Sequence, residues 1–217
     1  SRRDLGVPIE DSSLFNYLEM FVSADDLQKE IDIILDKWNK TNKEAIDKGN
    51  AYHSYRENLA KEQGYSINPF TNQKFKTIES VAIELINGVE FRKPTYNNLQ
   101  DLEDGFHPEL ILWNDAAKIA GQSDMVYIET IDDKRVAYIN DYKTNKKIDT
   151  YNPFKHKMLA PLNHLDECNF NHYRLQLSTY AWMLEEAGFK IQGLQISHLN
   201  TPNVFKYLRE EVVKLMN

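Results

Sequence analysis

The sequence has very little cysteine, no long hydrophobic run and no repeats. Its 217 residues include one cysteine, Cys168, so an intrachain disulfide and a cysteine-based zinc or iron–sulfur site are both excluded. No apolar run approaches the roughly 20 residues that a transmembrane helix needs. Neither an internal repeat nor a Gly/Ser-rich linker divides the chain. These absences favour a single domain over residues 1–217 without a membrane partner.

Composition and charge describe a folded, acidic chain. Apolar residues make up 41% and aromatic residues 12%, which is enough for a core. The first residues, SRRDLGVPIEDSS, are polar, so we expect no signal peptide, and the single cysteine favours a reducing, cytoplasmic location. The net charge of −7 argues weakly against a nucleic-acid partner. However, residues 143–157 hold five lysines against one aspartate, which is a local basic strip.

The order of apolar and turn residues indicates a mixed α/β chain. Residues of about 20–64 read as helical, with a second helix beginning near Lys43 and ending before Gly64. Residues 65–75 are predicted to be a loop, and residues 79–89 fit either a short helix or a buried strand. From about residue 105 onward, we expect a catalytic part with three short antiparallel strands, a helix, a further strand and a final helix. This order predicts helices around a small mixed sheet.

A predicted hairpin brings two carboxylates together. If Asp132 and Asp133 form a two-residue turn, then facing residues sum to 265, and Asp124 faces Asp141. Opposed side chains lie about 5 Å apart on one face of a sheet. Lys143 lies two residues beyond Asp141 and therefore points to the same face. A one-residue slip of the register would separate these groups.

Two carboxylates at this distance repel each other unless a proton or a cation lies between them. Oxygen ligands in a compact cluster suit Mg²⁺ or Mn²⁺. The turn after residue 114 folds the preceding strand back, which places Glu109 near residues 122–124 as a third carboxylate for one or two ions. Lys143 would then assist a metal-activated water. The alternative is an ordinary solvent-facing Asp–Lys pair at the end of a strand.

Four motifs in order resemble the PD-(D/E)XK nuclease superfamily, in its RecB-like exonuclease branch. They are a helical histidine in GNAYH (His53), G-x-x-D in GQSD (Gly121 and Asp124), D-x-K in DYK (Asp141 and Lys143), and Q-x-x-x-Y in QLSTY (Gln176 and Tyr180). The resemblance covers residues 49–180 and implies a restriction-endonuclease-like α/β sandwich. Pro108–Glu109 is similar to an additional acidic position of some members.

The resemblance also implies roles for these residues. Asp124, Asp141 and the backbone carbonyl of Tyr142 would bind the metal, and His53 would belong to the metal site. Lys143 would assist the attacking water, and Gln176 and Tyr180 would hold the active site or the DNA strand. Asp141 stands where RecB-like members more often have Glu, and the cysteines of an iron–sulfur cluster are missing, so we expect a cluster-free member.

The helical residues His53 and Tyr180 and the basic strip also have structural interpretations that need no active site. His53 also fits a partly buried structural histidine, and Tyr180 fits a core residue beside Tyr173 and Leu177. The basic strip interleaves lysines with aromatic residues, which is typical of a loop that guides a DNA strand, although a plain solvated loop fits equally well. The predicted DNA-binding residues of this strip are Lys146, Lys147, Tyr151, Lys155 and Lys157.

Together with the resemblance, these residues predict a divalent-metal-dependent deoxyribonuclease, most simply an exonuclease of DNA recombination, repair or phage DNA processing in the cytoplasm of a bacterium or a phage-infected host cell. Two alternatives are a non-catalytic DNA-binding subunit that retains the fold, and a protein-interaction module with an acidic surface. The sequence does not distinguish exonuclease from endonuclease action, the polarity of cleavage, the strand preference, or monomer from dimer and trimer.

Overall fold

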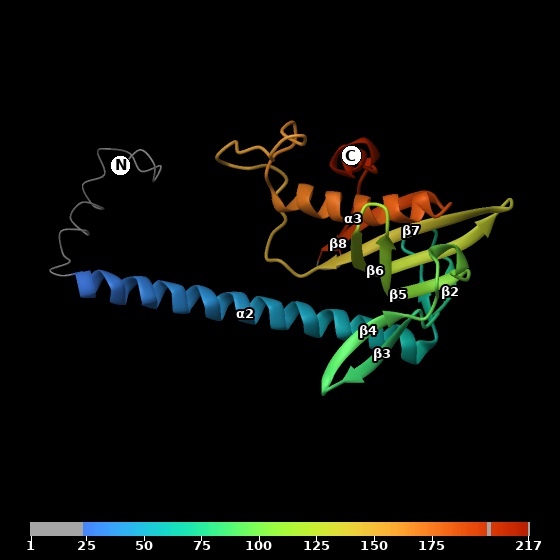
Figure 1. The fold of residues 1–217 in the computed structure, drawn as a ribbon, viewed down its shortest axis with the longest axis horizontal. Coiled ribbons are helices and arrows are strands. Elements are labelled where there is room, and N and C mark those ends of the chain that lie inside the picture. Colours follow the sequence, from blue (N-terminus) through green and yellow to red (C-terminus); the bar gives the residue numbers. More distant parts are fainter. Residues whose placement is uncertain (1–23, 199–200, 217) are drawn as a thin grey trace. The chain divides into compact units, whose positions relative to one another are not determined.

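The computed structural model describes residues 24–198 and 201–216 (Figure 1). The chain forms two compact units, residues 1–48 and residues 49–217. The described part of the first unit is entirely helical. It belongs to helix α2, Ala24–Gln63, which continues into the second unit. Residues 20–23 of the predicted N-terminal helical part lie outside the described residues.

Helix α2 is one uninterrupted element, so the prediction of two helices with a start near Lys43 was wrong. Its 40 residues contain no proline, and its one glycine, Gly49, is not enough to break it. Asp25 and Asp26 lie at its positive end, where acidic side chains are favourable. The helix ends as predicted before Gly64, whose positive φ of 69° suits glycine.

The second unit is a mixed α/β structure around a five-stranded mixed sheet, with strand order β5-β6-β7-β8-β9. The strands are β5 (Gly105–Asn114), β6 (Ile119–Ile131), β7 (Lys134–Lys143), β8 (Lys190–His198) and β9 (Thr201–Val204). Strands β5, β6 and β7 are the predicted antiparallel meander. Helix α3, Asn169–Glu186, follows β7, and β8 then pairs with β7 in parallel (Figure 1). Within the described residues, no helix is long and apolar enough to cross a membrane.

The register of the β6–β7 hairpin confirms the sequence prediction. Ile131 pairs with Lys134, and the pairing continues in the predicted register to Met125 opposite Asn140. Asp132 and Asp133 both have positive φ, 49° and 58°, as a two-residue turn of the primed type requires. The predicted pairing is therefore present from the turn to Met125 and Asn140, one residue short of Asp124 and Asp141.

Three segments differ from the prediction. Residues 65–75 are not a plain loop, because they contain strand β1 (Tyr65–Ile67) and the first part of β2 (Lys74–Lys76). Strand β9 was not predicted. The final helix α4, Arg209–Met216, begins later than the expected Val204. Pro202 lies in β9 at the open edge of the sheet, where a missing backbone donor costs little.

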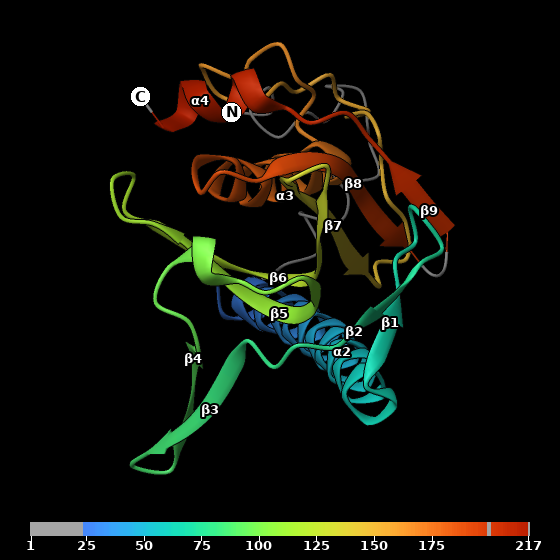
Figure 2. The same cartoon turned by 90° about the vertical axis from the view of Figure 1, so that its right-hand side faces the viewer.

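Residues 81–94 form an exposed hairpin outside the main sheet, made of β3 (Val81–Ile86) and β4 (Val89–Pro94) (Figure 2). Asn87 and Gly88 form its turn with φ values of 54° and 78°. An Asn-Gly pair between two apolar runs is a strong hairpin signal, and it would have decided between helix and strand. A 3₁₀ turn, Leu99–Asp101, leads from the hairpin to β5.

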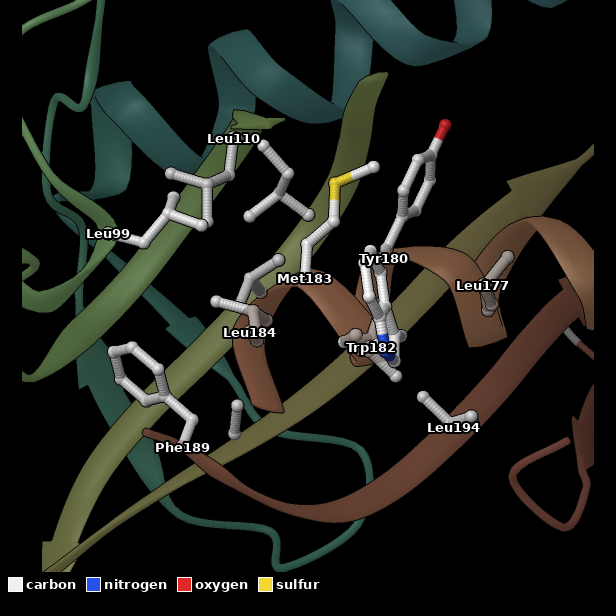
Figure 3. Close-up of a cluster of buried hydrophobic side chains, with 14 of the residues drawn as sticks. Leu99, Leu110, Leu177, Tyr180, Trp182, Met183, Leu184, Phe189 and Leu194 are labelled. Atoms are coloured by element: carbon white, nitrogen blue, oxygen red, sulfur yellow. The ribbon is translucent and has the colours of Figure 1, made fainter. Parts of the chain in front are cut away.

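Two hydrophobic clusters lie on the two faces of the main sheet. Alternate residues of β7 enter different clusters: Ala137 and Ile139 pack with α3, whereas Val136 and Tyr138 pack with Ala60 of α2 and with β2. The larger cluster gathers Leu177, Met183 and Leu184 of α3 against the strands (Figure 3). The sheet is therefore covered on both faces, as expected for a sheet in an α/β domain.

Candidate metal centre

Strand β5 changes its buried face at Glu109. Regular alternation would place Phe106 and Leu110 on one face, but Phe106 belongs to the cluster with Ala60, and Leu110 belongs to the cluster with α3. Glu109 has no strand partner between the pairs Pro108–Met125 and Leu110–Ser123, and its φ is +54°. A non-glycine residue in this left-handed region is uncommon and often marks a functional site.

Asp124 lies across from this irregular position. Its Oδ2 atom accepts a hydrogen bond of 2.7 Å from the backbone nitrogen of Tyr142, just beyond the last paired residues of β6 and β7. Glu109 is held in turn by Gln122, whose side-chain amide donates to the Glu109 carbonyl oxygen at 3.0 Å. The predicted approach of Glu109 to residues 122–124 is thus present.

His53 joins the two carboxylates from helix α2. Its Nδ1 atom lies 3.2 Å from Asp124 Oδ1 and 3.9 Å from Glu109 Oε1. One potential ligand atom from each of these three residues lies within 4.8 Å of the others. The hydrogen bonds to Asp124 and Glu109 raise the pKa of His53 to about 10, so a proton on His53 balances part of the local negative charge.

Asp141 and Lys143 form the second part of the site. Asp141 is almost completely buried, and its Oδ2 atom forms an ion pair of 2.6 Å with the Lys143 ammonium. Burial and the nearby charge of Asp124 raise the pKa of Asp141. Burial alone would lower the pKa of Lys143, but the Asp141 carboxylate raises it above its ordinary value. The ammonium also lies 4.7 Å from the centre of the Tyr173 ring.

The Q-x-x-x-Y motif lies against the G-x-x-D motif. The Gln176 amide donates a hydrogen bond of 3.0 Å to the Tyr180 hydroxyl. A Cβ atom at Gly121 would lie 2.5 Å from the Tyr180 ring, so only glycine allows this contact without movement. Tyr180 is also a core residue, with its ring in the larger cluster and its hydroxyl pointing away from Leu184 and Phe189 (Figure 3).

The residues present fit a divalent cation. Glu109 and Asp124 stand with His53 in one compact group, and the buried Asp141 carboxylate is paired with the Lys143 ammonium at 2.6 Å. Two carboxylates in one compact group repel each other unless a proton or a cation lies between them, and a divalent cation meets that need. Oxygen donors with a single imidazole are typical for Mg²⁺ or Mn²⁺, whereas structural zinc sites are built from cysteine and histidine.

Sequence reasoning missed the cationic residues around this site. Arg92 of the exposed hairpin lies 3.5 Å from Glu109 Oε2 and 3.3 Å from Glu57 Oε2. Arg56 of α2 lies over the Tyr142 ring at 4.8 Å. It lines a cavity of about 240 Å³ together with His53, Glu109 and Asp124. Neither arginine belongs to a motif. Arg92 lies in a hairpin that only tertiary folding brings beside Glu109.

The basic strip is less uniform than its sequence suggests. Lys147 is paired with Asp149, and Lys157 is paired with Asp166. Among the described residues, Lys146 and Lys155 have no carboxylate partner within ion-pair distance. Both are exposed, as is Tyr151. Phe154 is 78% exposed, and its ring lies near that of His156. This loop therefore offers two free lysines and exposed aromatic rings to a polyanion.

No family model, curated protein or solved structure matches this chain.

Proposed function

We propose that the chain is a divalent-metal-dependent deoxyribonuclease with a restriction-endonuclease-like α/β sandwich, similar to RecB-like exonucleases. The observation that carries this proposal is the convergence of four sequence motifs. His53 contacts Asp124, the backbone nitrogen of Tyr142 in the D-x-K motif donates a hydrogen bond to Asp124, and the Tyr180 ring covers Gly121. Each motif has an ordinary structural explanation alone, but their meeting at one end of a sheet favours a single active site.

Asp124, Asp141, Glu109 and the Tyr142 carbonyl would hold the metal, and His53 would join them as a neutral imidazole after the metal displaces its proton. When bound, Mg²⁺ or Mn²⁺ acidifies a water molecule and neutralises phosphate charge. Lys143 carries a proton at neutral pH, because the Asp141 carboxylate raises its pKa. Its ammonium would stabilise the charge that develops on the phosphate during in-line attack. Gln176 and Tyr180 hold the α3 side of the site in place.

The substrate would be a DNA end in recombination, repair or phage DNA processing. Lys146, Lys155 and Tyr151 would guide the strand, with lysines on phosphates and rings on bases. Lys147 and Lys157 would have to exchange Asp149 and Asp166 for phosphate. We therefore expect the two unpaired lysines to contribute more to DNA affinity.

The test is cleavage of end-labelled linear and circular DNA with Mg²⁺ or Mn²⁺. Asp141→Asn and Lys143→Ala should abolish cleavage, and so should EDTA. Asp132→Asn is the matched control, because Asp132 lies at the exposed turn far along the hairpin from Asp124 and should leave activity unchanged. Equal cleavage by Asp141→Asn and the wild type would refute the proposal. Tight DNA binding without cleavage under either metal would support the non-catalytic alternative.

A further inference from the structure

The described part of the first unit, residues 24–48, carries a solvent-exposed apolar stripe. Leu27, Ile31, Ile34 and Trp38 are each between 40% and 62% exposed. Their spacing of four, three and four residues places them on one side of α2 in the pattern of a coiled-coil seam. In proteins most helical stability comes from packing of an apolar face, so this segment, about 37 Å long, would gain stability if its stripe were covered.

The charges of the same segment are divided along its length. Residues 24–36 contain five acidic residues and one basic residue, whereas residues 37–48 contain four basic residues and two acidic ones. Two parallel copies would place acidic half against acidic half. Two antiparallel copies would place each acidic half against the basic half of the other, which is the favourable arrangement.

We propose that residues 24–48 are a self-association surface that pairs with a second copy of this chain as an antiparallel coiled coil. In this arrangement, Leu27 packs against Trp38 of the second copy, and Ile31 packs against Ile34 of the second copy. Each of these two contacts joins large apolar side chains from both copies. The two-fold symmetry of the pair produces each contact twice.

The residues beside the seam support this register. Glu30 and Lys37 flank the stripe, and in the antiparallel pairing Glu30 of one copy lies beside Lys37 of the other. Among the described residues, neither has an ion-pair partner within its own chain. Moving the register by seven residues would instead place Lys37 beside Lys37 and Glu30 beside Glu44, and it would leave Leu27 against Ala45.

The first experiment is light scattering with size-exclusion chromatography on the full chain over a range of concentrations. We expect a dimer for the wild type and, for Ile34→Asp, a dimer at least about tenfold weaker, since burying a charge in the seam is unfavourable. Ile33→Asp is the matched control. Ile33 is the neighbouring isoleucine, 61% exposed and outside the seam, so this variant should remain a dimer with unchanged helix content.

The second experiment tests orientation by disulfide trapping. The double variant Leu27→Cys/Trp38→Cys should form a covalent dimer under mild oxidation, because positions 27 and 38 face each other in the antiparallel pair. Leu27→Cys alone should not. The wild type controls for the native Cys168, which is buried. A monomer at all concentrations, equal effects of Ile33→Asp and Ile34→Asp, or a covalent dimer from Leu27→Cys alone would each overturn the proposal.

Discussion

Replacing Gly121 by alanine tests whether the contact between two motifs is structurally required. The added Cβ atom would lie 2.5 Å from the Tyr180 Cε1 atom and 3.2 Å from its Cζ and hydroxyl oxygen. To restore an ordinary contact of 3.4 Å, the ring must move by about 0.9 Å. Tyr180 is 8% exposed and belongs to the larger hydrophobic cluster, so the surrounding side chains resist this movement.

We expect Gly121→Ala to lower the free energy of unfolding by about 1–3 kcal/mol, which is the usual cost of overpacking a core. For a chain of this size, the melting temperature should fall by about 2–4 °C per kcal/mol. Urea and thermal unfolding measure both quantities. Gly49→Ala is the matched control. Its new Cβ would meet only Thr144 Oγ1 at 3.7 Å, and alanine is favoured over glycine inside a helix by about 1 kcal/mol.

A double-mutant cycle isolates the contact. In a Tyr180→Leu background, the ring is absent, so Gly121→Ala should cost clearly less than in the wild type. A coupling energy of about 0.5–3 kcal/mol is expected for side chains in direct contact. If Gly121→Ala costs the same in both backgrounds, or costs no more than Gly49→Ala, then the Tyr180 ring does not explain this glycine.

Three further predictions concern other parts of the second unit. Burial lowers the pKa of His107 to about 4, and its neutral ring is already held by Ser80 and the Glu103 carbonyl. Below pH 6.5 the His107 side chain therefore binds a proton in the unfolded chain but not in the folded one. The free energy of unfolding should fall towards pH 4 by up to about 1.4 kcal/mol per pH unit. Urea unfolding from pH 7 to pH 5 should show a weaker pH dependence of stability for His107→Gln than for the wild type. Arg92→Gln removes a cation beside Glu109, so titration calorimetry should show Mn²⁺ binding tightened by about two- to fivefold, and unchanged or weaker binding would contradict this. Lys146→Gln should reduce the slope of DNA affinity against salt concentration by about one phosphate contact, whereas Lys147→Gln, which loses a lysine paired with Asp149, should change it less.

The sequence predicted best where local chemistry fixes the structure. The Asp132–Asp133 turn determined the register of β6 and β7, and the glycine at position 64 determined the end of α2. The approach of Glu109 to Asp124 also followed from strand order. In each case a short-range signal was sufficient, because turn residues and the alternation of side chains set the geometry.

Prediction failed where distant segments decide the outcome. The left-handed conformation of Glu109 has no local sequence signal, although it moves the carboxylate into the site. Arg92 reaches Glu109 from the hairpin of β3 and β4, 17 residues earlier in the chain. The division of the lysines into paired and unpaired groups depends on Asp166, which only tertiary folding brings beside Lys157.

The left-handed backbone at position 109 has a consequence for sequence drift. Glycine adopts a φ of +54° more readily than glutamate, so Glu109→Gly would relax the backbone while removing a carboxylate. A descendant of this chain that no longer needed the carboxylate would gain stability from that change. Laboratory evolution can test this. If glutamate is retained under selection for activity but replaced under selection for heat resistance alone, then activity and not stability keeps glutamate at position 109.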